Sequence, residues 1–133
     1  MKRLFVLVSA APFFTAFMTD AAPPKHHVVS EVSGYTCMML KLTDAQRMDF
    51  AHAPQFKTAP TSDAANVAPL TGQVAIRDDV APENGYAEAI NFAGRKVWAA
   101  TTFLAPYHVE SEPNTTCHVV KYSDNTYGFT YRR

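Results

Sequence analysis

The position of its two cysteines constrains the fold of this chain more than any other feature of the sequence. Cys37 and Cys117 are the only cysteines in 133 residues, and 80 positions separate them. Two cysteines in a small exported domain usually form one disulfide, which here connects the first segment of the domain to the last. Closing a loop of this length stabilises a fold by about 4–5 kcal/mol in chain entropy. The sequence therefore predicts a Cys37–Cys117 disulfide.

The alternative reading of Cys117 is a catalytic thiol, with the adjacent His118 as its base. Adjacent residues on an extended chain point to opposite faces, so His118 is badly placed to take the thiol proton. The disulfide is the better interpretation of this cysteine.

The oxidising compartment is inferred from the N-terminus. Lys2 and Arg3 precede an uncharged run over residues 4–17, and the small residues Thr19 and Ala21 flank Asp20. A basic start, an apolar stretch and small residues before a cut are typical of a secretory signal peptide. A membrane anchor is the alternative, but a spanning helix needs about 20 apolar residues. We expect cleavage after residue 21 or 22, export to the periplasm or the exterior, and no membrane insertion afterwards.

Charge argues against two classes of partner. Without residues 1–21 the chain carries ten Lys and Arg against eleven Asp and Glu, scattered without a run of either sign. Nucleic-acid binding needs a basic surface, and electrostatic attachment to anionic lipid needs a basic cluster. We expect a monomer that binds neither, with a flexible polar leader over residues 22–33 and one domain over residues 34–133.

The pattern of short apolar runs between turn residues predicts a mainly β domain. Strands are expected over residues 35–42, 55–58 and 73–77, a hairpin over 86–100 with a single 3₁₀ turn after it, and a C-terminal hairpin over 117–131. Between the first two strands, Thr43 and Gln46 have the spacing of a capping box, which predicts a short helix ending before Pro54. Met48 and Phe50 are expected to cover one face of the sheet with this helix.

Residues 54–107 resemble a bacterial SH3-like (SH3b) domain. The similar segments are Asn84-Gly85-Tyr86, residues 91–98 with Gly94 and Trp98, residues 102–104, and the early segment 56–63. The chain departs from the family pattern where the usual NVRSGPS run is absent and where Val97 replaces the glycine before the tryptophan. The resemblance implies a small SH3-like β-barrel, with a short N-terminal helix and a C-terminal β-hairpin added at its ends.

The resemblance also implies a function. SH3-like domains usually bind through a groove lined by aromatic side chains, and their exported members take cell-wall peptides or envelope proteins as ligands. Tyr86, Trp98 and Tyr107 are the matching candidates for such a groove. Tyrosine and tryptophan suit a half-wet groove because each has an apolar body and a polar end.

Catalytic motifs are not recognisable in the sequence. It contains no Gly-rich phosphate loop, no H-E-x-x-H, no G-x-S-x-G and no cysteine pair with zinc spacing. The pairs Asp78-Asp79 and Glu110/Glu112 lack a partner that would separate their pKa values for acid–base work. We therefore expect a non-catalytic binding module without a metal or cofactor.

Two other functions remain open. A small disulfide-bonded exported domain can act as an envelope inhibitor or immunity-type protein, and the polar loop over residues 110–114 is then the segment that blocks the target. A small enzyme using Cys117 or His108 is the third possibility.

Overall fold

A computed structural model describes residues 26–133, and the predicted signal peptide lies outside these residues. The described chain is mainly β, which confirms the predicted fold class. In order, the elements are β1 (Val28–Glu31), β2 (Tyr35–Leu40), α1 (Asp44–Met48), the 3₁₀ helix η1 (Phe50–His52), β3 (Gln55–Lys57), β4 (Asn66–Pro69), β5 (Gln73–Arg77), β6 (Tyr86–Ile90), β7 (Lys96–Ala100), η2 (Thr101–Phe103), β8 (Leu104–Pro106), β9 (Thr116–Tyr122) and β10 (Tyr127–Arg132).

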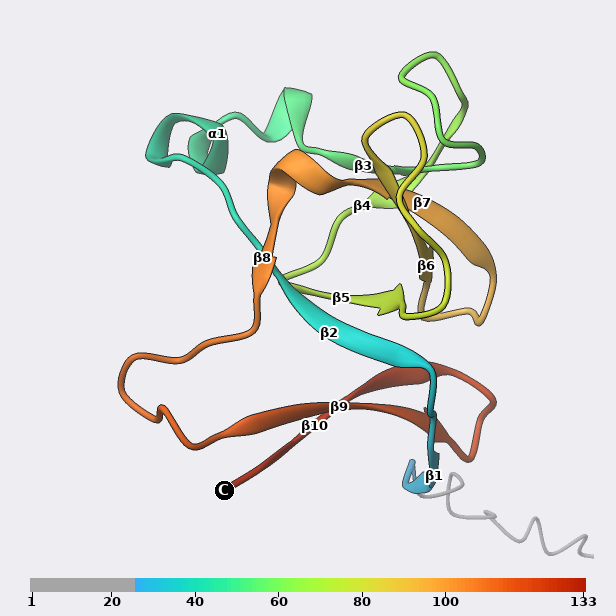
Figure 1. The fold of residues 1–133 in the computed structure, drawn as a ribbon, viewed down its shortest axis with the longest axis vertical. Helices are drawn as coiled ribbons and strands as arrows, with labels where there is room; N and C mark the ends of the chain where they lie inside the picture. The colour runs from blue at the N-terminus through green and yellow to red at the C-terminus, as the bar shows by residue number, and fades with distance from the viewer. Residues whose placement is uncertain (1–25) are drawn as a thin grey trace, which may run out of the picture.

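The strands form two antiparallel sheets. The larger sheet has seven strands in the order β4-β3-β7-β6-β5-β2-β8, and the smaller has the order β1-β9-β10. Figure 1 shows the larger sheet curling through the upper part of the molecule, with β9 and β10 lying below β2. Within the described chain no strand pair joins β4 to β8, so these two strands are the edges of the curled sheet.

Two clusters of apolar side chains hold this arrangement together. The first lies within the larger sheet and includes Val74 and Val97, each 1% exposed. The second lies between the two sheets and joins Ala75 and Cys37 to Val119 of β9. Because successive strand residues point to opposite faces, Val74 and Ala75 place β5 in both clusters at once. This inner strand of the larger sheet is therefore covered on both sides.

Both predicted hairpins are present. In the first, β6 pairs with β7 through a turn in which the Asn91 side chain accepts hydrogen bonds from the backbone N–H groups of Ala93 and Arg95. Gly94 follows with a φ of +74°, and a Cβ there would lie 2.6 Å from the Tyr127 ring. This turn needs glycine both for its left-handed conformation and for the ring that covers it. The predicted 3₁₀ turn after β7 is η2.

The predicted capping box is confirmed, but the role expected for its helix is wrong. Thr43 accepts from the Gln46 backbone, and the Gln46 side chain accepts from Thr43 in return. Met48 and Phe50 were expected to cover the sheet, yet they are 75% and 82% exposed. A helix of five residues has too short a face to cover the core, and Leu40, Phe103 and Leu104 of the sheet region pack there instead.

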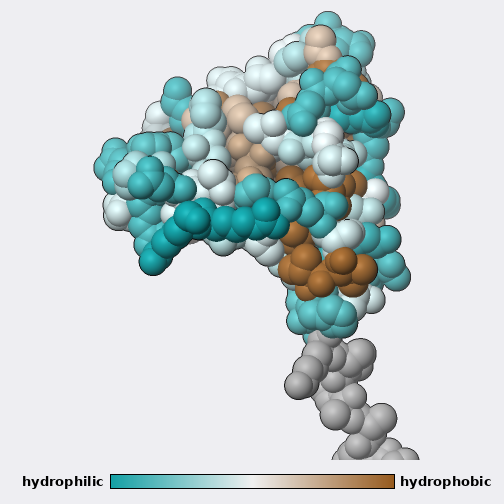
Figure 2. Space-filling view, turned by 60° about the horizontal axis from the view of Figure 1, so that its bottom comes forward, coloured by the Kyte–Doolittle hydropathy of each residue, from teal (hydrophilic) through white to brown (hydrophobic). Residues whose placement is uncertain are grey.

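The structure also differs from the sequence expectation at the leader. Residues 22–33 were expected to be a flexible polar segment, but Val28–Glu31 forms β1 and pairs with β9 across a register shift. The pairing satisfies the backbone groups on the second edge of β9, which a polar sequence pattern does not reveal. Figure 2 shows a largely hydrophilic surface, with hydrophobic atoms gathered beside the point where the described chain begins. Val28 and Val29 of β1, which are 42% and 60% exposed, lie at this end of the described chain.

Candidate functional site

An open cleft of about 640 Å³ lies between the larger sheet and the start of β9. The strand β2 and the end of β8 form one wall, and the segment leading into β9 forms the other. The lining residues are Tyr35, Thr36, Cys37, Met38, Pro106, Tyr107, Pro113, Thr115, Thr116 and Cys117. Apolar, aromatic and hydroxyl-bearing side chains make up this lining, and none of the lining residues that the structure describes is charged.

The predicted disulfide is present and joins the two walls of the cleft. Cys37 of β2 and Cys117 of β9 are bonded, with their Cα atoms 6.0 Å apart. Both cysteines line the cleft. The catalytic thiol at Cys117 is therefore wrong, because neither cysteine is free. The bridge instead fixes the separation of the two sheets beside the cleft.

Tyr107 is one of the two tyrosines that line this cleft, and the only one of the three predicted groove residues that does so in the described chain. The pairing of β8 with β2 reaches its end at Pro106, opposite Met38, and the chain then turns away towards β9. Tyr107 follows this end and packs against the second apolar cluster. Its ring stacks on Tyr131 of β10 with centroids 5.8 Å apart. The ring is therefore half-buried, and its position is fixed by Tyr131 and by the second apolar cluster.

The other two predicted groove residues lie elsewhere. Trp98 is 8% exposed on β7, where it faces Glu88 of β6 and Lys57 of β3 across the sheet. Tyr86 begins β6 and lies on the same face, diagonally from Trp98. Neither residue lines the cleft around Tyr107. The structure thus brings Tyr86 and Trp98 together and separates both from Tyr107.

Several lining residues were missed from the sequence, above all Tyr35, Pro113 and Thr115. The available signal was their distance along the chain from a cysteine. Tyr35 lies two residues before Cys37, and Thr115 lies two before Cys117. Residues at i and i+2 of a strand share a face, so a disulfide between two segments brings the neighbours of both cysteines together.

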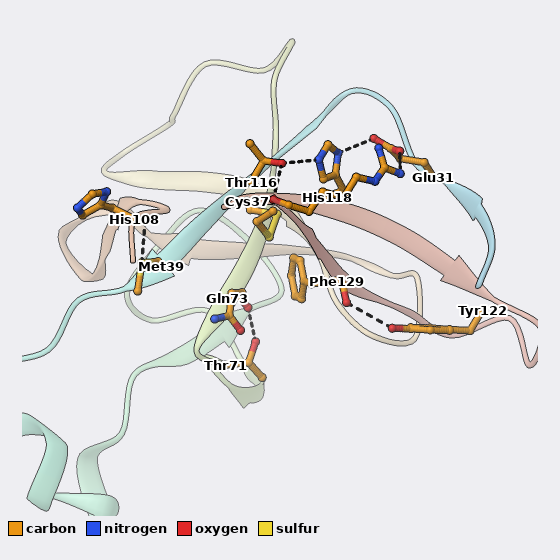
Figure 3. Close-up of a disulfide and its surroundings, with 12 residues drawn as sticks. Glu31, Cys37, Met39, Thr71, Gln73, His108, Thr116, His118, Tyr122 and Phe129 are labelled. Atoms are coloured by element: carbon orange, nitrogen blue, oxygen red, sulfur yellow. Dashed lines mark hydrogen bonds and ion pairs between the residues drawn. A yellow bond between two sulfur atoms is a disulfide. The ribbon is translucent and has the colours of Figure 1, made fainter. Parts of the chain in front are cut away.

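A chain of hydrogen bonds lies at the rim of the cleft, above the disulfide in Figure 3. The Thr116 Oγ1 atom is 2.9 Å from His118 Nε2, and His118 Nδ1 is 2.7 Å from Glu31 Oε1. Arg132 donates to the other Glu31 oxygen at 2.6 Å. From the sequence, His118 was considered only as the neighbour of Cys117. Its contact with Glu31 could not be predicted, because Glu31 is 87 residues away and belongs to the segment expected to be a flexible leader.

This network predicts that the protein loses stability as the pH becomes acid. Hydrogen bonds from His118, and then from Arg132, hold the pKa of Glu31 below its ordinary value of 4.5. A carboxyl whose folded pKa is lowered stabilises the fold above its unfolded pKa, and this contribution is lost as the pH falls through the folded value. We expect Glu31→Gln to melt at a lower temperature than the wild type at pH 7, and the difference to shrink as the pH falls through the lowered pKa of Glu31. Thermal melts of both proteins from pH 7 to pH 3 test this, and a constant difference across that range contradicts it.

The loop over residues 110–114, expected to block a target under the inhibitor hypothesis, is held by its own contacts. The Glu112 backbone N–H donates to Val109 at 3.1 Å, and Thr115 donates back to the Glu112 carbonyl at 3.0 Å. The Glu112 carboxylate accepts from the Thr115 hydroxyl and from Arg133. The loop is thus ordered by the molecule itself, with one of its two carboxylates already paired.

The remaining chemical candidates have structural contacts. Asp78 accepts from Thr36 at 2.6 Å, and Asp79 is paired with Arg77 at 2.7 Å, which lowers the pKa of Asp79. The backbone N–H of His108 lies 3.1 Å from the sulfur of Met39. Among residues 26–133, no group of three or more His, Cys, Asp or Glu side chains is placed to hold a metal ion. In the same part of the chain, no helix is long and apolar enough to cross a membrane.

Comparison with known proteins adds no relative to this description, because no family model, curated protein or solved structure matches the chain.

Proposed function

We propose that this protein is an exported SH3-like module that binds a peptide segment of the cell wall or of an envelope protein. The observation that carries the proposal is the open cleft lined by Tyr35, Pro106, Tyr107 and Pro113. Its volume of about 640 Å³ falls in the range of about 300–1,000 Å³ that is usual for ligand sites. The two tyrosines each offer a flat apolar surface and a hydroxyl, which suits a ligand with both apolar and amide groups.

The organisation of the larger sheet supports the SH3-like part of the proposal. The six strands β3 to β8 all lie within residues 54–107, the segment that resembles the family. They form the curled sheet together with β2. The tight turn over residues 91–95 lies within the Trp-bearing hairpin and the 3₁₀ turn η2 follows it, in the order expected from the resemblance, which supports this part of the proposal. A curled antiparallel sheet of this segment is compatible with an SH3-like domain extended by β2 and by the C-terminal hairpin.

The composition of the cleft narrows the ligand class. Its lining residues carry no formal charge, so charge attraction does not select the ligand at this site. Recognition then rests on burial of apolar groups against the tyrosine and proline rings and on hydrogen bonds to threonine hydroxyls. An uncharged stretch of extended peptide fits these groups. The disulfide along the cleft is compatible with an exported protein, in which such a bridge persists.

Binding to purified peptidoglycan sacculi tests the proposal. We expect Tyr107→Ala to weaken binding at least about tenfold, because it removes a large ring from the cleft. Tyr86→Ala is the matched control, since Tyr86 is also a half-buried tyrosine on a strand but lies outside the cleft. Thermal melts of each variant establish that the protein is folded. If both variants bind as the wild type does, or if Tyr86→Ala is the weaker binder, the assignment of the cleft is wrong.

A pull-down of one envelope protein, lost on Tyr107→Ala, supports the protein-ligand form of the same proposal. The inhibitor hypothesis rests on the loop over residues 110–114, which is ordered by hydrogen bonds of Glu112 within the loop. Inhibition of an envelope hydrolase that is lost on Glu112→Ala but kept on Tyr107→Ala favours the inhibitor over the binding module.

A further inference from the structure

We propose that Thr116 and His118 form a nucleophile–base pair that accepts the acyl group of an ester, with Glu31 positioning the imidazole. The hydroxyl lies 2.9 Å from His118 Nε2, and the opposite ring nitrogen lies 2.7 Å from the Glu31 carboxylate. A hydroxyl, an imidazole and a carboxylate within hydrogen-bond reach and in this order are the arrangement of acyl-transfer sites on unrelated folds. This activity goes beyond peptide binding and does not depend on it.

The carboxylate selects the reactive form of the imidazole. Glu31 Oε1 accepts a hydrogen bond, so the proton of neutral His118 sits on Nδ1 and leaves Nε2 as an acceptor. Nε2 is the atom that faces the Thr116 hydroxyl. The hydrogen bond from His118, and then the one that Arg132 donates to Glu31 Oε2, keep the pKa of this carboxyl low, so Glu31 stays ionised at neutral pH. Ionised Glu31 is therefore placed to orient the imidazole with Nε2 towards the Thr116 hydroxyl.

The position of the pair allows a substrate to reach it. Thr116 is exposed and borders the cleft. Because Cys117 lies between them in β9, Thr116 and His118 share the face of the strand opposite the disulfide, with Thr130 and Arg132 of β10 beside them. The His118 side chain is 25% exposed, which shields the ring while leaving its edge accessible. The backbone carbonyl of Arg132 also lies near the hydroxyl, but at 3.4 Å it is the weaker acceptor. An ester that approaches this exposed face of β9 can therefore reach the hydroxyl.

The reaction balances without a cofactor. Thr116 Oγ1 forms a bond to the acyl carbon as the hydroxyl proton passes to His118 Nε2. The bond from the acyl carbon to the alcohol oxygen then breaks, and the imidazole returns the proton to the departing alcohol. Water next attacks the acyl-threonine, gives a proton to His118, and releases the carboxylic acid as the threonine hydroxyl is restored. Ester and water become acid and alcohol.

A fluorophosphonate probe tests the nucleophile directly, because the probe traps an activated hydroxyl as an O–P adduct with loss of fluoride. We expect peptide mass spectrometry of the probe-treated, disulfide-intact protein to find the adduct on Thr116. His118→Ala should slow labelling by roughly 100-fold or more, which is the usual scale of general-base catalysis. Thr116→Ser should keep labelling, which guards against a variant that simply fails to fold. Thr130→Val is the matched control, since Thr130 lies opposite His118 on β10 and outside the pair.

The positioning role of Glu31 has its own readout. Nitrogen-15 spectra of the imidazole should show the proton on Nδ1 in the wild type and a mixture of tautomers in Glu31→Gln. The proposal is overturned if Thr116 stays unlabelled, if His118→Ala labels as fast as the wild type, or if Thr130→Val removes the adduct. A doubly protonated His118 at neutral pH also overturns it, because both ring nitrogens then donate. None of these outcomes bears on peptide binding, so the esterase proposal and the binding proposal can be refuted independently.

Discussion

Replacing Cys37 and Cys117 together by alanine is expected to lower the free energy of unfolding by about 4–5 kcal/mol, the chain entropy of an 80-residue loop. The bridge connects β2 of the larger sheet to β9 of the smaller one. In the unfolded chain it prevents these segments from separating, and in the folded state Cys37 belongs to the apolar cluster between the sheets. Urea unfolding of the wild type and the double variant, followed by circular dichroism, measures the difference.

Unfolding the wild type with and without a reductant provides the control for this prediction. Reduction leaves the side-chain volume almost unchanged, so the stability lost on reduction reports the covalent bond alone. The double variant should lose at least as much, because alanine is also smaller than cysteine. A loss below about 1 kcal/mol in both experiments contradicts the view that the disulfide holds the two sheets together.

Trp98→Ala is expected to destabilise the protein by about 3–5 kcal/mol. The Trp98 side chain is almost fully buried between Glu88 and Lys57 on the neighbouring strands, so the change leaves a large cavity. Tyr86→Ala, on the same sheet face but only half-buried, should cost about 1 kcal/mol. Chemical unfolding of the two variants measures both effects. If Trp98→Ala is as stable as the wild type and loses binding to sacculi, Trp98 belongs to the ligand site after all.

The parts of the fold that the sequence could predict are those specified by local chemistry. The helix cap at Thr43 depends on residues three apart, and the hairpin turns depend on Asn91, Gly94 and Asp124. Each of these signals is complete within a few residues. The disulfide was also predictable, because a chain with two cysteines has one possible intramolecular pair.

The parts that could not be predicted depend on which strand or sheet face each segment packs against in the folded protein. The sequence pattern of the short helix suggests an apolar side for Met48 and Phe50, yet strands of the larger sheet already fill the core beneath them. The strand β1 is recognisable only once β9 is known to need a partner on its second edge. In physical terms, strand register and sheet order decide both outcomes, and neither is encoded locally.

The same reason separates the predicted groove from the observed cleft. Tyr86, Trp98 and Tyr107 were grouped through the resemblance to a family, which follows order along the chain. The cleft is instead assembled by the disulfide, which adds Tyr35 and Pro113 from outside the matched segment. The hydrogen-bonded chain of Thr116, His118 and Glu31 likewise forms only because β1 pairs with β9. Sites assembled from segments far apart in the sequence cannot be read from either segment alone.

Backbone amide chemical-shift mapping during titration with peptides released from sacculi tests the assignment of the cleft most directly. The protein should be labelled with nitrogen-15 and kept in its disulfide-bonded form. We expect the largest shifts at Tyr35, Thr36, Tyr107 and Thr115, which surround the cleft. Shifts centred on Tyr86 and Trp98, or none at any peptide concentration, would contradict the assignment of the cleft as the binding site.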